Sequence, residues 1–226
     1  MLHFPPPLNR IRGLAEAVSR SAMNQPPAAK FESLLDGYPL ADLERHDGPI
    51  YGLWQDLSLA YFNAAWDRFA LQNGGDTEFL DRWSEGASIL EAFPEKLRAF
   101  YKLSYEKCLA TGEPWEHEYE CSSPSVFRKF HQIVYPLKDA ALIVVNSLVA
   151  EQPHDPSQGE TGNVDESLYR DEDGFVHQCA HCRRVQRQSD ELTWDWVPDW
   201  VASIPPDSTH TFCPTCYGHY WGKPGS

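Results

Sequence analysis

Basic residues are scarce in this sequence, which has 19 lysines and arginines against 33 aspartates and glutamates. The net charge is −14 and the sequence pI is about 5.0. Binding to nucleic-acid phosphates needs clustered positive charge. A short basic stretch, CRRVQR with Arg183, Arg184 and Arg187, has acidic neighbours. The composition therefore argues against a nucleic-acid partner and favours solubility.

Long apolar runs are also missing. The longest strongly apolar run, from Ala140 to Val145, is far too short to span a bilayer. The N-terminal MLHFPPPLNRIRGLAEAV contains a proline run and two arginines, so it has no uninterrupted apolar core of the kind that a signal peptide needs. We therefore expect a cytoplasmic protein with no membrane partner. Thiols stay reduced in that compartment.

Familiar catalytic motifs are absent from the sequence. It shows no Ser-His-Asp pattern, no HExxH, and no histidine-kinase phosphoacceptor helix followed by a nucleotide-binding segment. The GETG at 159–162 lacks the GK[ST] of a phosphate-binding loop. We therefore expect a protein that is not an enzyme.

Cysteine is rare, but four of the 6 cysteines fall in two CxxC pairs, CAHC and CPTC. Each CxxC lets two sulfurs bind one ion while the backbone turns tightly around it, and two pairs supply four thiolates in the tetrahedral geometry of zinc. The sequence thus predicts a structural zinc site formed by Cys179, Cys182, Cys213 and Cys216. Such a site has no open coordination position, so we expect no catalysis by the metal.

The paired thiols are compatible with other kinds of site. A redox CxxC needs only one pair on a βαβ unit, and disulfides need an oxidising compartment. An iron–sulfur cluster also takes four cysteines, and the spacing does not exclude it. His177, His181 or His210 could replace a cysteine, although a role beside the ligands or none at all is favoured. Residues 169–222 contain few Leu, Ile and Val, so the metal should supply much of their stability, and a chelator should unfold them while the rest survives.

Hydrophobic periodicity divides the chain into regions. An amphipathic helix is expected at 9–22, a strand pair at 50–54 and 57–62, a helix from Asn63, a longer helix at 97–109, and three strands at 115–121, 127–135 and 140–149. The resulting domain prediction is an N-terminal helical extension (1–48), a sheet domain (49–150), a polar linker (151–168) and a zinc-binding module (169–226). This order predicts an α+β fold, with a five-stranded antiparallel sheet and helices on one face.

Three stretches of the sheet domain resemble a PAS sensory domain. PIYGLWQDLSLAYFNAAWDRFA is similar to the opening strand pair and the Asn that starts the first helix, here Asn63. YEKCLATGEPWEHEYECSS resembles the long helix, its Gly and the next strand, and FRKFHQIVYPLKDAALIVVNSL resembles the last two strands. The pieces CAHCRRV, a Trp-containing segment and FCPTCYGHYW are similar to a four-cysteine module that accompanies PAS domains in bacterial signalling proteins.

The resemblance implies a sensory or adaptor protein that receives a cue or binds a signalling partner. PAS domains often pair through flanking helices, so a homodimer through the N-terminal helix or the sheet is expected. Such domains hold haem, a small molecule or nothing, and the light-sensing types are disfavoured because their cysteine motifs are missing. An alternative is haem or redox sensing through His117, His131 or Cys121. The candidate ligand-binding residues are Trp54, Asn63, Tyr101, His117, Arg128 and His131, although such aromatics more often fill a core.

Overall fold

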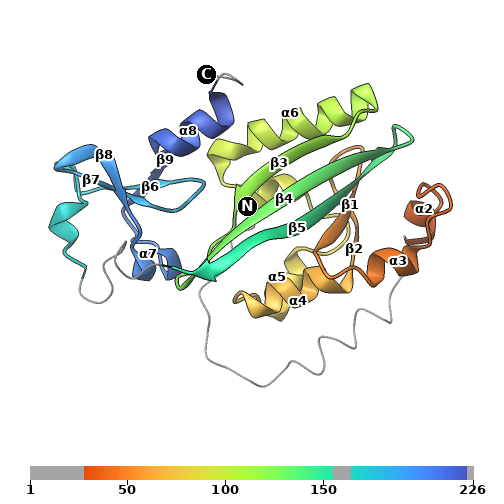
Figure 1. Ribbon diagram of the computed structural model, residues 1–226, viewed down its shortest axis with the longest axis horizontal. Helices are drawn as coiled ribbons and strands as arrows, with labels where there is room; N and C mark the ends of the chain where they lie inside the picture. The colour runs from red at the N-terminus through yellow and green to blue at the C-terminus, as the bar shows by residue number, and fades with distance from the viewer. Residues whose placement is uncertain (1–27, 155–163, 223–226) are drawn as a thin grey trace.

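The computed structural model describes residues 28–154 and 164–222 (Figure 1). The helix expected at 9–22 lies outside these residues. The described chain forms a large sheet with helices and, at one end of it, a small second sheet (Figure 1). Among the described residues, no helix combines the length and the apolarity that crossing a membrane requires.

The large sheet confirms the predicted five-stranded antiparallel arrangement. Its strands, in the spatial order β2-β1-β5-β4-β3, are β1 (Ile50–Trp54), β2 (Leu59–Phe62), β3 (Trp115–Glu120), β4 (Val126–Leu137) and β5 (Ala141–Pro153). β5 lies in the middle, as its continuous apolar run predicts, and pairs with β1 and β4. Among the described strands of this sheet, β3 pairs with β4 alone and lies at the edge, so one row of its backbone groups faces outward.

Four helical elements cover one face of the sheet: α4 (Ala64–Gln72), α5 (Thr77–Arg82), the 3-10 helix η1 (Ile89–Ala92) and α6 (Glu95–Thr111). Asn63 is the N-cap of α4, as predicted, and its side chain accepts a hydrogen bond from the backbone N–H of Trp66. α6 ends at Gly112, whose φ of 70° is a left-handed conformation that glycine adopts without strain.

The prediction of helices on one face alone is incomplete. Two short helices, α2 (Ala28–Glu32) and α3 (Leu40–Glu44), lie against the opposite face at β1, β2 and β5. Phe31 is fully buried there and stacks on Tyr61 at 5.7 Å between ring centroids. A Cβ on Gly52 would lie 2.3 Å from the Phe31 ring, so glycine is required at this position.

The C-terminal module has its own sheet, in the order β8-β7-β6-β9. Its elements are η3 (Glu166–Leu168), β6 (Val176–Cys179), β7 (Val185–Arg187), β8 (Asp190–Asp195), α7 (Pro198–Ala202), β9 (Ser208–Thr211) and α8 (Pro214–Trp221). β5 ends at Pro153 and η3 begins at Glu166, so both elements extend into the segment 151–168 that the sequence predicts as a linker.

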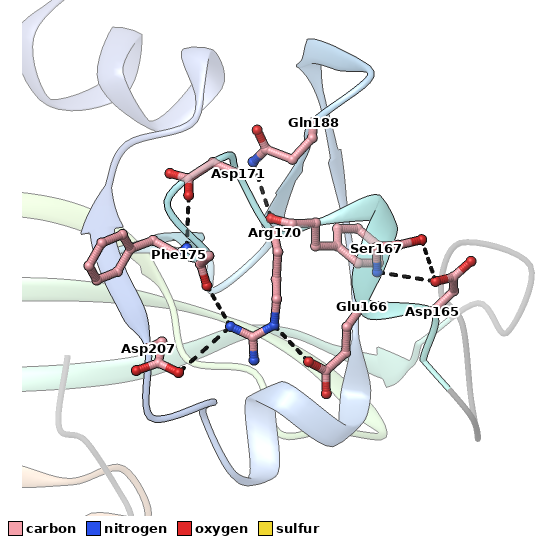
Figure 2. Close-up of polar contacts among 10 residues, drawn as sticks. Asp165, Glu166, Ser167, Arg170, Asp171, Phe175, Gln188 and Asp207 are labelled. Carbon is pink, nitrogen blue, oxygen red and sulfur yellow. Dashed lines mark hydrogen bonds and ion pairs between the residues drawn. The ribbon is translucent and has the colours of Figure 1, made fainter.

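Polar contacts hold the first loop of the module in place (Figure 2). Arg170 Nε donates to Glu166 at 2.7 Å, and Nη1 of the same guanidinium donates to the Gly174 carbonyl at 2.6 Å. The side chain of Asp171 accepts from the backbone N–H of Phe175 at 2.8 Å. The loop is thus tied by charge-assisted hydrogen bonds rather than by apolar packing alone.

Candidate metal centre and buried cavity

The four cysteines of the two CxxC pairs meet in one buried cluster. Cys179 ends β6 and Cys182 follows in the next turn, whereas Cys213 is the N-cap of α8 and Cys216 lies in its first turn. The parallel pairing of β6 with β9 brings Cys179 opposite Thr211, so the two pairs lie side by side. Their sulfur atoms all lie within 4.8 Å of one another.

The geometry of this cluster fits a tetrahedral metal ion. Sulfurs bound at about 2.3 Å in a tetrahedron are separated by about 3.8 Å. The Sγ atoms of Cys182 and Cys213 are 3.8 Å apart. Four buried thiols without charged carboxylates among them are a soft ligand set, which selects zinc or iron over calcium or magnesium. The four cysteines could therefore hold one metal ion such as zinc.

His181 lies beside the cluster and contacts one of its sulfurs. Its Nε2 is 3.1 Å from the backbone N–H of Glu120 in β3 and must accept that hydrogen bond. The ring proton is therefore on Nδ1, which donates to Cys216 Sγ at 3.3 Å. Burial lowers the pKa of His181 to about 3, so the ring stays neutral. A histidine that donates to a metal-binding thiolate orients it and balances part of its charge.

The other two histidines that the sequence placed near the thiols do not reach them. His177 Nε2 pairs with Asp171 at 2.7 Å, on the loop of Figure 2. His210 lies on β9, and burial lowers its pKa.

The module packs against the outward edge of β3. His219 Nε2 donates to the Glu118 carbonyl at 2.9 Å, and the Glu120 N–H donates to His181. These two β3 residues are two apart, so their backbone groups point to the same side of the strand. The module thereby covers an edge that would otherwise be open to pairing with another strand.

Apolar packing strengthens this interface. Tyr220 of α8 is 8% exposed and belongs to the same hydrophobic cluster as α6 and the sheet. Its ring meets Phe100 edge to face at 4.7 Å, and α8 lies beside α6 and β3 in Figure 1. Farther along the interface, Trp196 Nε1 donates to the Pro124 carbonyl at 3.2 Å. None of these contacts was predicted. The aromatic residues that follow CPTC in FCPTCYGHYW were the available signal for the packing of Tyr220.

The core of the sheet domain contains a small cavity of about 40 Å³ between the sheet and helices α4 and α6. Aromatic and apolar side chains form most of its wall, and Gln132 and Asn146 of the central strands add amide groups. Gln132 Nε2 donates to Asn146 Oδ1 at 3.0 Å, and Tyr119 OH donates to the same oxygen at 3.0 Å. Tyr105 OH donates to Gln132 Oε1 at 3.2 Å.

This polar network was missed by the sequence analysis. Gln132 and Asn146 are each 3% exposed, on strands whose other inward residues are apolar. A polar residue at an inward position of a core strand was the available signal. Burial raises the pKa of Tyr51 and Tyr119 at the cavity wall, so both hydroxyls stay neutral hydrogen-bonding groups.

Of the six candidate ligand-binding residues, Tyr101 lines the cavity. Trp54 packs against Phe31 on the opposite face of the sheet, and Asn63 caps α4. His131 lies 3.2 Å from Glu116, on strands β4 and β3. Arg128 pairs with Glu151 at 2.6 Å, and His117 stacks on Trp115 near Tyr220. These five residues are not part of the cavity wall.

His117 should make the protein sensitive to acid. Burial, followed by the charge of His219, lowers its pKa from 6.5 to about 3. Below pH 6.5 this histidine is protonated in the unfolded chain but stays neutral in the folded protein. The contribution of the neutral ring to the free energy of unfolding is therefore complete above pH 6.5 and is lost as the pH falls toward 3. The loss approaches about 1.4 kcal/mol per pH unit for one proton.

Urea unfolding between pH 7 and pH 5.5 measures this effect. The variant His117→Phe keeps an aromatic ring but cannot be protonated, so its free energy of unfolding should fall less steeply with pH. The free energy of unfolding of this variant should still fall somewhat with pH, because burial also lowers the pKa of His181. Parallel pH profiles for the variant and the natural protein would contradict the prediction.

Comparison with known proteins found similarity to solved structures only. No protein-family model matches the chain, and no curated protein matches it. The PAS domain of BvgS from Bordetella pertussis is similar at 18% identity and a TM-score of 0.40, over 50% of this chain and 84% of that one.

Two further structures show similarity to the chain. The PAS domain of an HTR-like protein from Haloarcula marismortui has 15% identity and a TM-score of 0.30, over 54% of this chain and 96% of that one. A sensory box sensor histidine kinase from Vibrio cholerae has 14% identity and a TM-score of 0.28, over 63% and 100%. The chain joins a five-stranded antiparallel α+β domain to a small sheet that carries four clustered cysteines. PAS domains are among the solved structures to which it is similar.

Proposed function

We propose that this protein is a non-enzymatic sensory or adaptor protein. In this proposal the sheet domain binds a small neutral molecule in its buried cavity, and the metal-binding module relays the binding event or docks a signalling partner. The observation that carries the proposal is the hydrogen-bonding network of Gln132, Asn146 and Tyr119 at the wall of a small aromatic cavity. Ligand pockets combine such an apolar wall with a few convergent polar groups.

The cavity wall limits the kind of ligand. The described residues of the wall contribute amide, hydroxyl and thiol groups but no Asp, Glu, Lys, Arg or His side chain. A charged ligand buried there would lack a partner of opposite charge, which costs several kcal/mol or more. Phe93 and Tyr101, stacked at 3.9 Å between ring centroids, offer an apolar surface beside the amides. A small, neutral, hydrogen-bonding molecule with an apolar part suits this wall.

The alternative of haem or redox sensing has less support. A cavity of about 40 Å³ has room for a few water-sized groups, whereas pockets for large cofactors and drug-sized ligands measure about 300–1,000 Å³. His117 and His131, the expected axial ligands, do not line the cavity. Cys121 does line it, but burial raises the pKa of its thiol, which lowers its reactivity.

Homodimerisation remains part of the proposal. We expect it through the N-terminal helix or through the sheet, and the helix, at 9–22, lies outside the described residues. The cytoplasmic location is likewise a proposal that rests on the sequence.

A pair of matched variants tests the ligand site. Ala70 lines the cavity, and Ala65 on the same helix is equally buried at 2% exposure but is not part of the wall. Ala70→Val fills part of the cavity, so it should abolish retention of a small molecule that the natural protein carries through native purification. Ala65→Val should leave retention unchanged.

Mass spectrometry of denatured, natively purified protein identifies the retained molecule. Thermal-shift screening of the same three proteins against small neutral compounds extends the test to ligands that are lost on purification. If no compound binds the natural protein, or if both variants bind equally well, the proposed ligand site is wrong.

A further inference from the structure

The end of β3 belongs to the cavity and to the metal-site interface at once. Tyr119 and Cys121 contribute to the wall of the cavity, and Tyr119 also bonds to Asn146. The residue between them, Glu120, faces the module instead. Because alternate residues of a strand point to opposite sides, one short segment contacts both sites.

Glu120 is held from the first CxxC loop at two points. His181, between the two cysteines, accepts a hydrogen bond from the Glu120 amide. Arg184, two residues after Cys182, places its guanidinium 3.6 Å from the Glu120 carboxylate. That carboxylate is largely buried and also accepts from Ser122 Oγ at 2.9 Å. The loop that supplies half of the metal ligands therefore positions the strand end that closes the cavity.

We propose that the metal centre holds the cavity closed through His181, so that metal binding and opening of the cavity wall at the end of β3 are coupled. The proposal rests on the cavity being a ligand site. With a metal bound, Cys216 is a thiolate that fixes the His181 ring by accepting from Nδ1. The ring then holds the Glu120 amide with its other nitrogen. Without the metal, the CxxC loop loses its anchor. The end of β3 then loses its outer support but keeps its pairing with β4, where Glu120 lies opposite Lys129 and the Cys121 amide donates to the Arg128 carbonyl, so it moves away from Asn146 more easily.

Coupling of this kind is reciprocal. A ligand that needs an open wall should weaken metal binding, and one that binds the closed wall should strengthen it. His181 is thus a positioning residue between two sites rather than a ligand of either one.

The two cysteines outside the metal site provide a probe and its control. Cys121 is in the cavity wall, whereas Cys108 is buried on α6 and donates to the Val134 carbonyl at 3.6 Å, away from the module. In metal-loaded protein the other four thiols are protected by the metal. Alkylation of Cys121 by iodoacetamide, followed by peptide mass spectrometry, therefore reports opening at the end of β3.

His181→Phe retains an aromatic ring but makes neither hydrogen bond. It should keep one metal ion per chain, raise the alkylation rate of Cys121 by about tenfold and leave the rate of Cys108 unchanged. His181→Gln, whose amide both donates and accepts, should restore a rate close to that of the natural protein. If His181→Phe does not retain metal, Arg184→Gln removes the second link to Glu120 and carries the same test.

Unchanged labelling of Cys121 in the metal-loaded variants would overturn the proposal. Equal increases at Cys121 and Cys108 would also overturn it, because they would show general loosening of the domain. No ligand is used in this measurement, so an unsuccessful search for a ligand leaves its outcome interpretable.

Discussion

A strong chelator is expected to remove one metal ion per chain, unfold the C-terminal module and lower the stability of the sheet domain as well. The apparent binding free energy of structural zinc in small fingers is about 10–16 kcal/mol, and in such modules it is folding free energy. The module has a small apolar core of its own, around Tyr169, Val176 and Trp200. Loss of the metal should therefore unfold it.

The sheet domain should survive this treatment in a weakened form. Tyr220 completes the core around Phe100, and His219 and His181 cover the edge of β3. These contacts end when the module unfolds. The sequence alone predicted an independent sheet domain, whereas the interface predicts a lower melting temperature for it.

Two serine substitutions separate the metal effect from a general effect of losing a thiol. Cys213→Ser removes a metal ligand and should reproduce the chelated state, with less than one metal ion per chain by elemental analysis. Cys108→Ser removes a buried thiol outside the cluster and should keep one metal ion. Elemental analysis also distinguishes zinc from iron. If the chelated protein retained the near-ultraviolet circular dichroism of its module tryptophans, the metal would not be structural.

Replacing Asn63 by alanine is expected to destabilise the sheet domain by about 3–5 kcal/mol, far more than the loss of an ordinary helix cap. Its Oδ1 accepts from the backbone N–H groups of Ile50 and Trp66 at 3.0 and 3.1 Å. Its Nδ2 donates to the carbonyls of Leu43 and Gly48 at 3.0 and 3.1 Å. The side chain is fully buried, so alanine removes these four hydrogen bonds from the interior of the domain, although the Trp66 N–H and the Leu43 carbonyl each keep a backbone partner.

Asp76→Ala provides the matched control. Asp76 is the N-cap of α5, and its side chain accepts one hydrogen bond, from the Phe79 N–H at 2.9 Å. Its loss should cost about 1 kcal/mol. Urea unfolding followed by circular dichroism measures both changes. Similar losses for the two variants would mean that Asn63 acts only as a cap and does not join α4 to β1 and α3.

Local patterns in the sequence predicted most of the fold. Alternating and continuous apolar runs identified all five strands of the large sheet, and the continuous run in β5 predicted its central place. The two CxxC pairs identified four cysteines that the structure brings together. These features depend on residues a few positions apart, and the local backbone geometry allows such residues only a few relative positions.

The interface between the two parts could not be predicted in this way. His181 and Glu120 are 61 positions apart, and His117 and Tyr220 are 103 apart. Each is an ordinary residue in its own segment. Their contacts depend on how the sheet domain and the C-terminal module pack against each other, and the hydrophobic periodicity within each part does not predict that packing.

The sequence by itself therefore determined the strand pattern, the Asn63 cap and the candidate metal ligands, because each follows from short-range geometry. Only the tertiary structure decided that α2 and α3 cover the second face, that Gln132 and Asn146 contribute to the cavity wall, and that His181 links the thiols to β3. These features arise where segments distant in the sequence pack together and exclude water. A polar group buried by that packing forms its hydrogen bond with whichever residue the fold brings next to it.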